Sequence, residues 1–309
     1  MTQYVCNIKK SSIDNRDYIY IGSILNLPEI LDYRDNLTKI RDQGAQGTCF
    51  AHTAACVKEW QERKNNNFTE YFSPQFFYNN RFNKYDDNID NDEGMFPRDV
   101  MKLLKTVGIC SESSYPYGKI ESKTEIKSEI YDEAKLNIIH SYAKINTMTK
   151  LKNSLYENGP CLISFPVYNY TSNFWLGDEN SFIGGHAVTV VGYNLEGFII
   201  RNSWGKYWGE KGYSIYKYTD WGCHWELWTV IDENIIYNIE YINEGNINKL
   251  LDEKKNSNKE KNDNKSISYI GEYDSVNDSL GDDSIENIIE DHINVPLYKK
   301  ILRHLCPKL

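Results

Sequence analysis

Apolar residues recur at helical spacing in three segments between residues 48 and 108. TCFAHTAACVKEWQER has Thr48 as a candidate N-cap, and FSPQFFYNNRF opens with Ser73 and Pro74, a favoured N-cap and first-turn pair. FPRDVMKLLKTVGI has Gly108 as its stop signal. The apolar faces are Phe50, Ala54, Val57 and Trp60 in the first segment and Val100, Leu103, Leu104 and Val107 in the third. This pattern predicts three helices.

After about residue 130 the pattern changes to short stretches rich in β-branched and aromatic residues and separated by glycines. These stretches are LNIIHSYAKI, CLISFPVY, HAVTVVGY, GFIIRNSW, GYSIYKY and LWTVIDE. Their composition and length are typical of β-strands. Helices followed by strands predict an α+β fold, with a helical lobe before a β-rich lobe.

The two ends of the chain differ from this body. We expect residues 1–25 to form a short leader, which contains the strand-like letters YIYI, and residues 26–243 to form the compact domain. In 244–309 a charged, Asn- and Lys-rich stretch predicts a disordered linker. The isoleucines of SIENIIEDHI then predict a terminal helix, which either docks on the domain or binds a partner.

Composition narrows the function classes. The net charge is −9 and there is no basic stripe, which argues against nucleic acid as a partner. No segment reaches the length of a membrane span, and MTQYVCNIKK does not read as a signal peptide. Seven cysteines give no tidy pairing, so we expect reduced thiols and a cytoplasmic or other intracellular location, with a viral particle or a vesicle as alternatives.

The stretch DQGAQGTCFAH raises the question of whether Cys49 is a packed thiol or a nucleophile. Single free cysteines are usually small core residues. A thiol nucleophile needs a base, a group that orients the base, and donors for the oxyanion. GGHAVTVVGY supplies His186, 137 residues after Cys49 (186 − 49), and IIRNSWGKYWGEKGY supplies Asn202.

With these motifs in this order, the sequence resembles the papain-like (cathepsin-like) cysteine peptidases between about residues 27 and 231, nearer their bacterial and viral branch. A cysteine followed roughly 130–150 residues later by His and Asn is that family's pattern. FSPQFFYNN and GMFPRDVMKLLKTVGICSESSYPY also match the family's helical lobe. The resemblance implies a two-lobe fold with the active-site cleft between the lobes.

The resemblance assigns roles by position. Cys49 would be the nucleophile, His186 its partner in a thiolate–imidazolium pair, and Asn202 the residue that orients the imidazole. Gln43 would donate to the oxyanion, and Trp204 would cover the Asn202–His186 hydrogen bond. The expected protein is thus an endopeptidase, made as a zymogen, that cleaves peptide or protein substrates through a thioester acyl-enzyme without cofactor or metal.

Several positions depart from the family pattern. Gln46 stands where many relatives have a cysteine, so one common disulfide is not expected. Gly185 replaces a usual Asp or Asn near the pocket for the P1 side chain. Only Gly94 remains of two glycines that pair with substrate, and Phe96 and Pro97 are expected to line an apolar P2 pocket.

Alternatives remain open. His52 is a rival base, but it lies on the same predicted helix as Cys49. Cys223 and His224 are the nearest approach to a metal motif. The whole domain could be a catalytically silent peptide-binding module on the same fold. We also expect residues 1–25 to cover the cleft, which would let Cys6 approach Cys49.

Overall fold

The structure, a computed structural model, describes residues 4–22, 26–82 and 92–232. These all belong to the first of two compact units, residues 1–237. The predicted linker and terminal helix of 244–309, and the boundary predicted at 243, lie outside the described residues.

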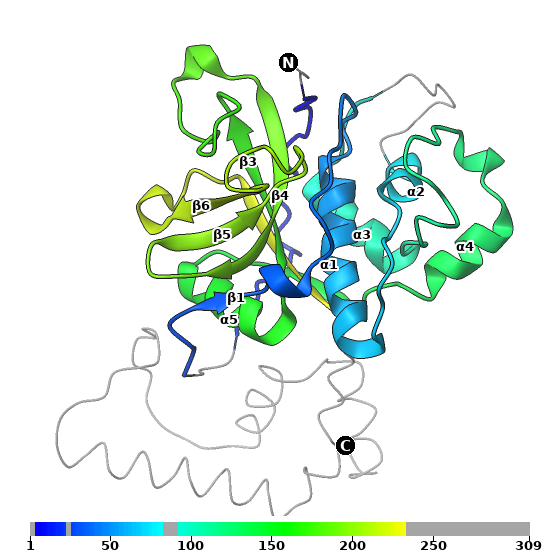
Figure 1. Cartoon of the computed structure of the whole chain (residues 1–309), viewed down its shortest axis with the longest axis horizontal. Helices are drawn as coiled ribbons and strands as arrows, with labels where there is room; N and C mark the ends of the chain where they lie inside the picture. Colours follow the sequence, from blue (N-terminus) through cyan, green and yellow to red (C-terminus); the bar gives the residue numbers. More distant parts are fainter. Residues whose placement is uncertain (1–3, 23–25, 83–91, 233–309) are drawn as a thin grey trace, which may run out of the picture. The chain divides into compact units, whose positions relative to one another are not determined.

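The helical lobe is built around α1 (Cys49–Asn66), with α2 (Pro74–Asn79), α3 (Pro97–Thr106) and α4 (Ser128–Lys135) beside it (Figure 1). Ser73 caps α2 as expected, since its hydroxyl accepts a hydrogen bond of 3.0 Å from the Phe76 N–H. Gly108 follows α3 with a φ of +79°, a conformation that favours glycine.

Thr48 occupies the N-cap position of α1, but its side chain does not cap the helix. The Thr48 hydroxyl lies 2.7 Å from the hydroxyl of Tyr117 instead. The predicted N-cap position is therefore confirmed, although the Thr48 hydroxyl bonds a tertiary partner and not the helix end.

The second lobe is an antiparallel sheet in the order β2–β7–β3–β4–β5–β6, with the short β1 beside β4. All six predicted strands are present, so the α+β prediction is confirmed. The bounds are β1 Leu31–Asp32, β2 Ser141–Lys144, β3 Cys161–Val167, β4 Gly184–Tyr193, β5 Gly197–Arg201, β6 Tyr213–Lys217 and β7 Glu226–Ile231. Two helices were not predicted, α4 in the helical lobe and α5 (Met148–Asn158), which joins β2 to β3.

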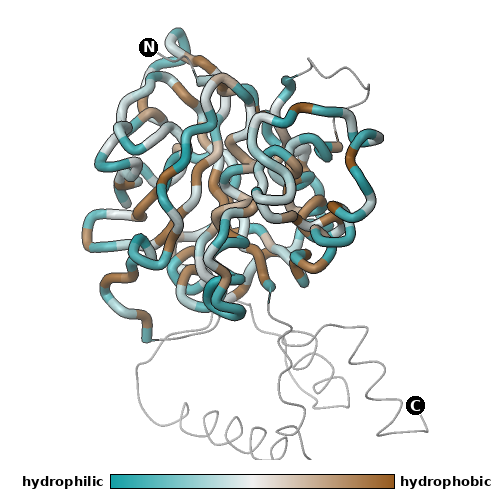
Figure 2. Tube along the Cα trace, turned by 45° about the vertical axis from the view of Figure 1, so that its right-hand side comes forward, coloured by the Kyte–Doolittle hydropathy of each residue, from teal (hydrophilic) through white to brown (hydrophobic). Residues whose placement is uncertain are grey.

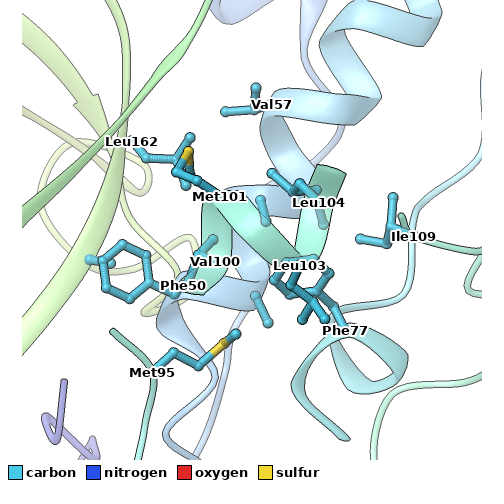
Figure 3. Packing of buried hydrophobic residues seen from close by; sticks show 14 of the residues in the cluster. Phe50, Val57, Phe77, Met95, Val100, Met101, Leu103, Leu104, Ile109 and Leu162 are labelled. Carbon is cyan, nitrogen blue, oxygen red and sulfur yellow. The ribbon is translucent and has the colours of Figure 1, made fainter. Parts of the chain in front are cut away.

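Three apolar clusters form the core of the described residues, of which the smallest packs α2 against α4 through Phe76 and Ala134. One joins α1 and α3 to the sheet, where Met101 of α3 lies near Leu162 of β3 (Figure 3). Another packs under the sheet against α5, through residues such as Leu151 and Leu155. Along the trace, hydrophobic positions gather toward the interior while the outer loops are mostly hydrophilic (Figure 2). The first cluster includes Cys49 and so fixes the start of α1 against β4.

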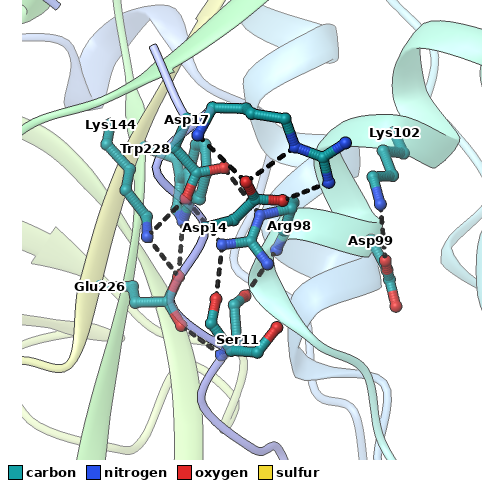
Figure 4. A network of polar contacts seen from close by, with 11 residues as sticks. Ser11, Asp14, Asp17, Arg98, Asp99, Lys102, Lys144, Glu226 and Trp228 are labelled. Atoms are coloured by element: carbon teal, nitrogen blue, oxygen red, sulfur yellow. Dashed lines mark hydrogen bonds and ion pairs between the residues drawn. The ribbon is translucent and has the colours of Figure 1, made fainter. Parts of the chain in front are cut away.

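The N-terminal segment, residues 4–22, runs along the boundary between the lobes (Figure 1). Arg98 on α3 holds its middle part, because the guanidinium donates to both oxygens of Asp17, at 2.7 and 2.6 Å. The Arg98 guanidinium also donates to the Ser12 carbonyl at 2.7 Å. Lys144 of β2 binds Asp17 from the sheet side at 2.8 Å (Figure 4). Charged groups of both lobes thus anchor this segment.

Candidate active site

Cys49 is the first residue of α1, and its side chain is fully buried. Burial raises the pKa of the Cys49 thiol to about 12, while hydrogen bonds from the backbone N–H groups of Ala187 and Phe50 act in the opposite direction. Ala187 lies on β4 next to His186, so the thiol sits where the helix start meets that strand. The helix dipole at this position favours a negative charge.

His186 and Asn202 are joined by a hydrogen bond of 2.7 Å between Nε2 and Oδ1. Asn202 Oδ1 also accepts from the Ser203 N–H at 2.7 Å, which fixes the orientation of the amide. The His186 Nε2 must therefore carry the proton, and Nδ1 has the lone pair. Among the described residues Nδ1 has no hydrogen-bond partner, so it is the nitrogen that can take a proton.

Trp204 covers this pair. Its indole stacks on the His186 ring with centroids 4.4 Å apart and planes 23° apart. Phe174 meets the same imidazole edge-on at 5.5 Å. The two aromatic rings shield the Asn202–His186 hydrogen bond from water, which strengthens it.

Gln43 is held in place by Ser203. The Ser203 hydroxyl donates to Gln43 Oε1 at 2.7 Å, and the Gln43 N–H donates to the Ser203 carbonyl at 2.8 Å. With Oε1 occupied, the side-chain NH₂ is left to donate to the Gln46 carbonyl at 3.0 Å and toward the Val5 carbonyl at 3.4 Å. Sequence reasoning did not single out Ser203, although it stands between Asn202 and Trp204 in the same motif.

Residues 4–8 lie directly on this site. Gly185 pairs with them in parallel: its N–H donates to the Cys6 carbonyl at 3.1 Å, and its carbonyl accepts from the Ile8 N–H at 3.4 Å. Val5 presents its carbonyl to Gln43, and Tyr4 stacks on Trp204. The backbone of Gly185 and the amide of Gln43 are thus occupied by the protein's own chain.

Burial sets the charge state of the site. Burial lowers the pKa of His186 to about 4, against the weaker opposing effect of the Asn202 hydrogen bond. Together with the raised pKa of Cys49, this makes a neutral thiol and a neutral imidazole the stable forms at neutral pH. With residues 4–8 in place, the structure does not favour the thiolate–imidazolium pair.

The substrate-binding residues expected from the sequence differ in their relation to the N-terminal segment. Gly94 has a φ of +69°, and a Cβ there would lie 2.5 Å from Asn7 Oδ1, so the N-terminal segment passes close to it. Pro97 is the first residue of α3, and Phe96 is its N-cap. A Cβ on Gly185 would instead meet Ile8 and Trp225, at 2.7 and 2.3 Å. Ile8 therefore lies in an apolar corner beside Trp225, a residue that the sequence placed in the core or the cleft wall.

The loop before Cys49 is held by Asp92, also missed from sequence. Its carboxylate accepts from the Gly47 N–H at 3.1 and 2.8 Å and from the Tyr78 hydroxyl. Asn7 binds the same residue, since its amide donates to the Asp92 carbonyl. Hydrogen bonds therefore tie the Gln46–Gly47 turn to the Asp92 segment. All six cysteines in the described residues are free thiols.

The other candidate histidines have hydrogen-bond partners outside the Cys49, His186 and Asn202 group or are exposed. His52 Nδ1 is 3.1 Å from the Thr48 carbonyl on its own helix, and its ring packs against Tyr117. His224 binds the Tyr216 hydroxyl at 2.9 Å, and His140 is exposed. In the described part of the chain no group of three His, Cys, Asp or Glu side chains is placed to hold a metal ion, and no helix is long and apolar enough to cross a membrane.

Comparison with known proteins shows the family to which the chain belongs. The family model of the papain family cysteine protease matches residues 27–232, so the chain belongs to that family. A peptidase C1-like protein of Acanthamoeba polyphaga mimivirus is 30% identical over 247 residues, covering 71% of this chain and 78% of its own. A cathepsin L-like proteinase of Fasciola hepatica is 29% identical, covering 60% and 59%. The chain spans between half and two thirds of the length of that proteinase and of papain from Carica papaya.

Solved structures show the same fold. Xylellain, a cysteine protease from Xylella fastidiosa, is 26% identical with a TM-score of 0.64, covering 74% of this chain and 96% of its own. The proform of the ragweed protease Amb a 11 has a TM-score of 0.57 at 22% identity, covering 71% and 69%. The protein is thus a papain-like cysteine peptidase, with the viral and bacterial likeness expected from its sequence.

Proposed function

We propose that the protein is an endopeptidase in which Cys49, His186, Asn202 and Gln43 carry the chemistry. The observation that carries the proposal is the 2.7 Å hydrogen bond between His186 Nε2 and Asn202 Oδ1. This bond leaves the lone pair of Nδ1 as the base, and the Ala187 N–H donates to the Cys49 sulfur from the residue next to that base.

In the proposed reaction, His186 Nδ1 takes the proton of the Cys49 thiol, and the sulfur attacks the substrate carbonyl carbon. The Gln43 amide and the Cys49 N–H stabilise the resulting oxyanion. His186 then gives its proton to the leaving amine as the C–N bond breaks, which leaves a thioester on Cys49. Water, deprotonated by His186, hydrolyses the thioester and restores the thiol.

Residues 4–8 would keep this site closed until they are moved or cut. They bond the Gly185 backbone and meet the Gln43 amide, which a substrate would also need. The relative Amb a 11 was solved in its proform, which supports a zymogen. The blocked form and the active form would then differ mainly in where these five residues lie.

The decisive experiment compares peptide hydrolysis by the full chain, by a chain in which Met1 is followed directly by Lys9, and by both with Cys49→Ala. We expect the shortened chain to be the most active and Cys49→Ala to abolish turnover in both. Cys223→Ser is the matched control, because Cys223 is a free thiol outside the site.

The alternative of a silent peptide-binding module gives a different result. It predicts that peptides bind the shortened chain without turnover and that His186→Ala leaves their affinity unchanged. Equal hydrolysis by wild type and Cys49→Ala would refute the proposed nucleophile.

A further inference from the structure

A small cavity borders Asn202, and none of its lining residues belongs to the N-terminal segment. Its volume is about 20 Å³. One water molecule needs on the order of 10–15 Å³, counted as the space open to its centre. The cavity is lined by residues that include His52, Cys56, Glu59, Thr189, Arg201 and Asn202.

Three polar atoms of these lining residues have no hydrogen-bond partner in the described chain. They are Asn202 Nδ2, Arg201 Nη1 and His52 Nε2. All three side chains are buried, with exposed fractions of 3, 5 and 5%. Buried polar atoms are almost always paired with protein or with ordered water. Three such atoms around one cavity indicate a common partner.

The chemistry of the three atoms specifies that partner. The Asn202 NH₂ and the Arg201 guanidinium can only donate. His52 Nδ1 lies 3.1 Å from a carbonyl oxygen, so Nδ1 carries the proton and Nε2 can only accept. Burial, with the nearby charge of Arg41, lowers the pKa of His52 to about 3, so the ring stays neutral.

Water satisfies all three atoms, since it accepts two hydrogen bonds and donates one. A halide would suit the two donors but would face the lone pair of His52 and the carboxylate of Glu59. A metal cation would face the guanidinium of Arg201. Water is therefore the ligand that fits.

We propose that one water molecule binds in this cavity, accepts from Asn202 and Arg201, and donates to His52. By holding the NH₂ end of Asn202, the water keeps Oδ1 aimed at His186. His52 is then a positioning residue that acts through the water and Asn202, a role that rests on the proposed peptidase function. The water site itself does not depend on that function.

A crystal structure of the full chain, grown in bromide, tests the ligand. The expected result is a density peak bonded to the three atoms without anomalous signal. A bromide signal at that point would show an anion site, and a cavity without density would overturn the proposal.

Kinetics of His52→Phe and His52→Gln test the role. Phenylalanine keeps the ring volume but cannot accept, whereas glutamine keeps both a donor and an acceptor. In the chain lacking residues 2–8, we expect His52→Phe to lower kcat about 10-fold, as loss of an orienting partner typically does. KM should change little, and His52→Gln should retain most of the rate.

A double mutant separates positioning from general damage. If His52 acts through Asn202, His52→Phe should cause no further fall in kcat in the Asn202→Ala background. An equal fall in both backgrounds would overturn the positioning role. If the chain lacking residues 2–8, with every other residue unchanged, shows no peptidase activity, the proposed function fails, and the water site is then judged by diffraction alone.

Discussion

The ring of Tyr4 stacks on the indole of Trp204, with centroids 4.9 Å apart and planes within 11°. The Tyr4 hydroxyl also donates to the Trp204 carbonyl at 2.8 Å. Because Trp204 in turn stacks on His186, Tyr4 is attached to the residue that covers the His186–Asn202 hydrogen bond. In the proposed mechanism, attachment of the N-terminal segment and catalysis therefore share one side chain.

Tyr4→Ala should loosen this attachment and raise activity in the full chain. Stacked aromatic pairs contribute roughly 0.5–1.5 kcal/mol beyond their buried area. A net hydrogen bond adds about 1 kcal/mol. The open fraction, and with it the initial rate of peptide hydrolysis, should rise about tenfold. Tyr18→Ala is the control, since Tyr18 is 80% exposed. Identical rates for Tyr4→Ala and wild type would mean that this stacking does not hold the site closed.

Arg98→Ala should release the same segment from its other end. The Arg98–Asp17 pair is buried, with side chains 10 and 8% exposed, and breaking a buried pair typically costs about 3 kcal/mol or more. In the variant Lys144 still binds Asp17, so we expect the free-energy cost to lie at the lower end of that range. The readout is faster alkylation of Cys49 at neutral pH in the full chain.

Lys102→Ala is the matched control for Arg98→Ala. Lys102 is on the same helix, but its pair with Asp99 is 3.7 Å long and half exposed. Such surface pairs contribute little. If Cys49 is alkylated at the wild-type rate in both variants, the Arg98 network anchors the N-terminal segment but does not control access to the Cys49 thiol.

Local pattern was enough to predict the helices and strands whose ends carry strong signals, such as Ser73 before α2 and Gly108 after α3. Helix α5 was missed, although Thr147 caps it, accepting from the Lys150 N–H at 3.2 Å, and Gly159 follows it with a φ of +84°. Its apolar face is narrow, with Leu151 and Leu155 among polar residues. Because the apolar periodicity of α5 is weak, the helix was not predicted, although both of its ends carry clear signals.

The residues of the candidate site also fall into two groups, those that could be predicted from the sequence and those that could not. Cys49, His186 and Asn202 stand in motifs that can be recognised by order and spacing. Ser203 and Asp92 could not be assigned, because their roles depend on contacts between residues far apart in the chain. The Asp92 carboxylate, for example, binds the N–H of Gly47, 45 residues earlier. Only the folded chain brings such groups together.

Acid should destabilise the fold through its buried histidines. Burial lowers the pKa of His186 and of His224 to about 4, from 6.5. Between these values the unfolded chain binds protons that the folded chain does not, so stability falls as the pH falls through that window. For His186 the loss is on the order of 3 kcal/mol.

His224→Phe isolates one of these contributions without touching the site. Urea unfolding at about pH 7 and about pH 5 should show a smaller difference in free energy for the variant than for wild type. The carboxylates titrate alike in both proteins, so the difference reports His224. The same pH dependence in both proteins would show that His224 titrates normally in the fold.

The ionisation of Cys49 should depend on residues 4–8. In the full chain burial raises the pKa of Cys49 to about 12 and lowers that of His186 to about 4, so the thiol keeps its proton through the neutral range. Removing residues 2–8 returns water to both groups. The pKa of Cys49 then falls and that of His186 rises, and transfer of the proton from sulfur to imidazole becomes favourable.

Alkylation of each cysteine against pH, read by peptide mass spectrometry, measures this change. In the shortened chain Cys49 should react more than tenfold faster than in the full chain at about pH 6, where an ordinary thiol of pKa about 8.5 is almost fully protonated. His186→Ala should remove the gain, because no imidazolium then stabilises the thiolate, while the rate for Cys223 should stay constant. If shortening speeds Cys49 equally with and without His186, the segment shields the sulfur only sterically and the ion pair plays no part.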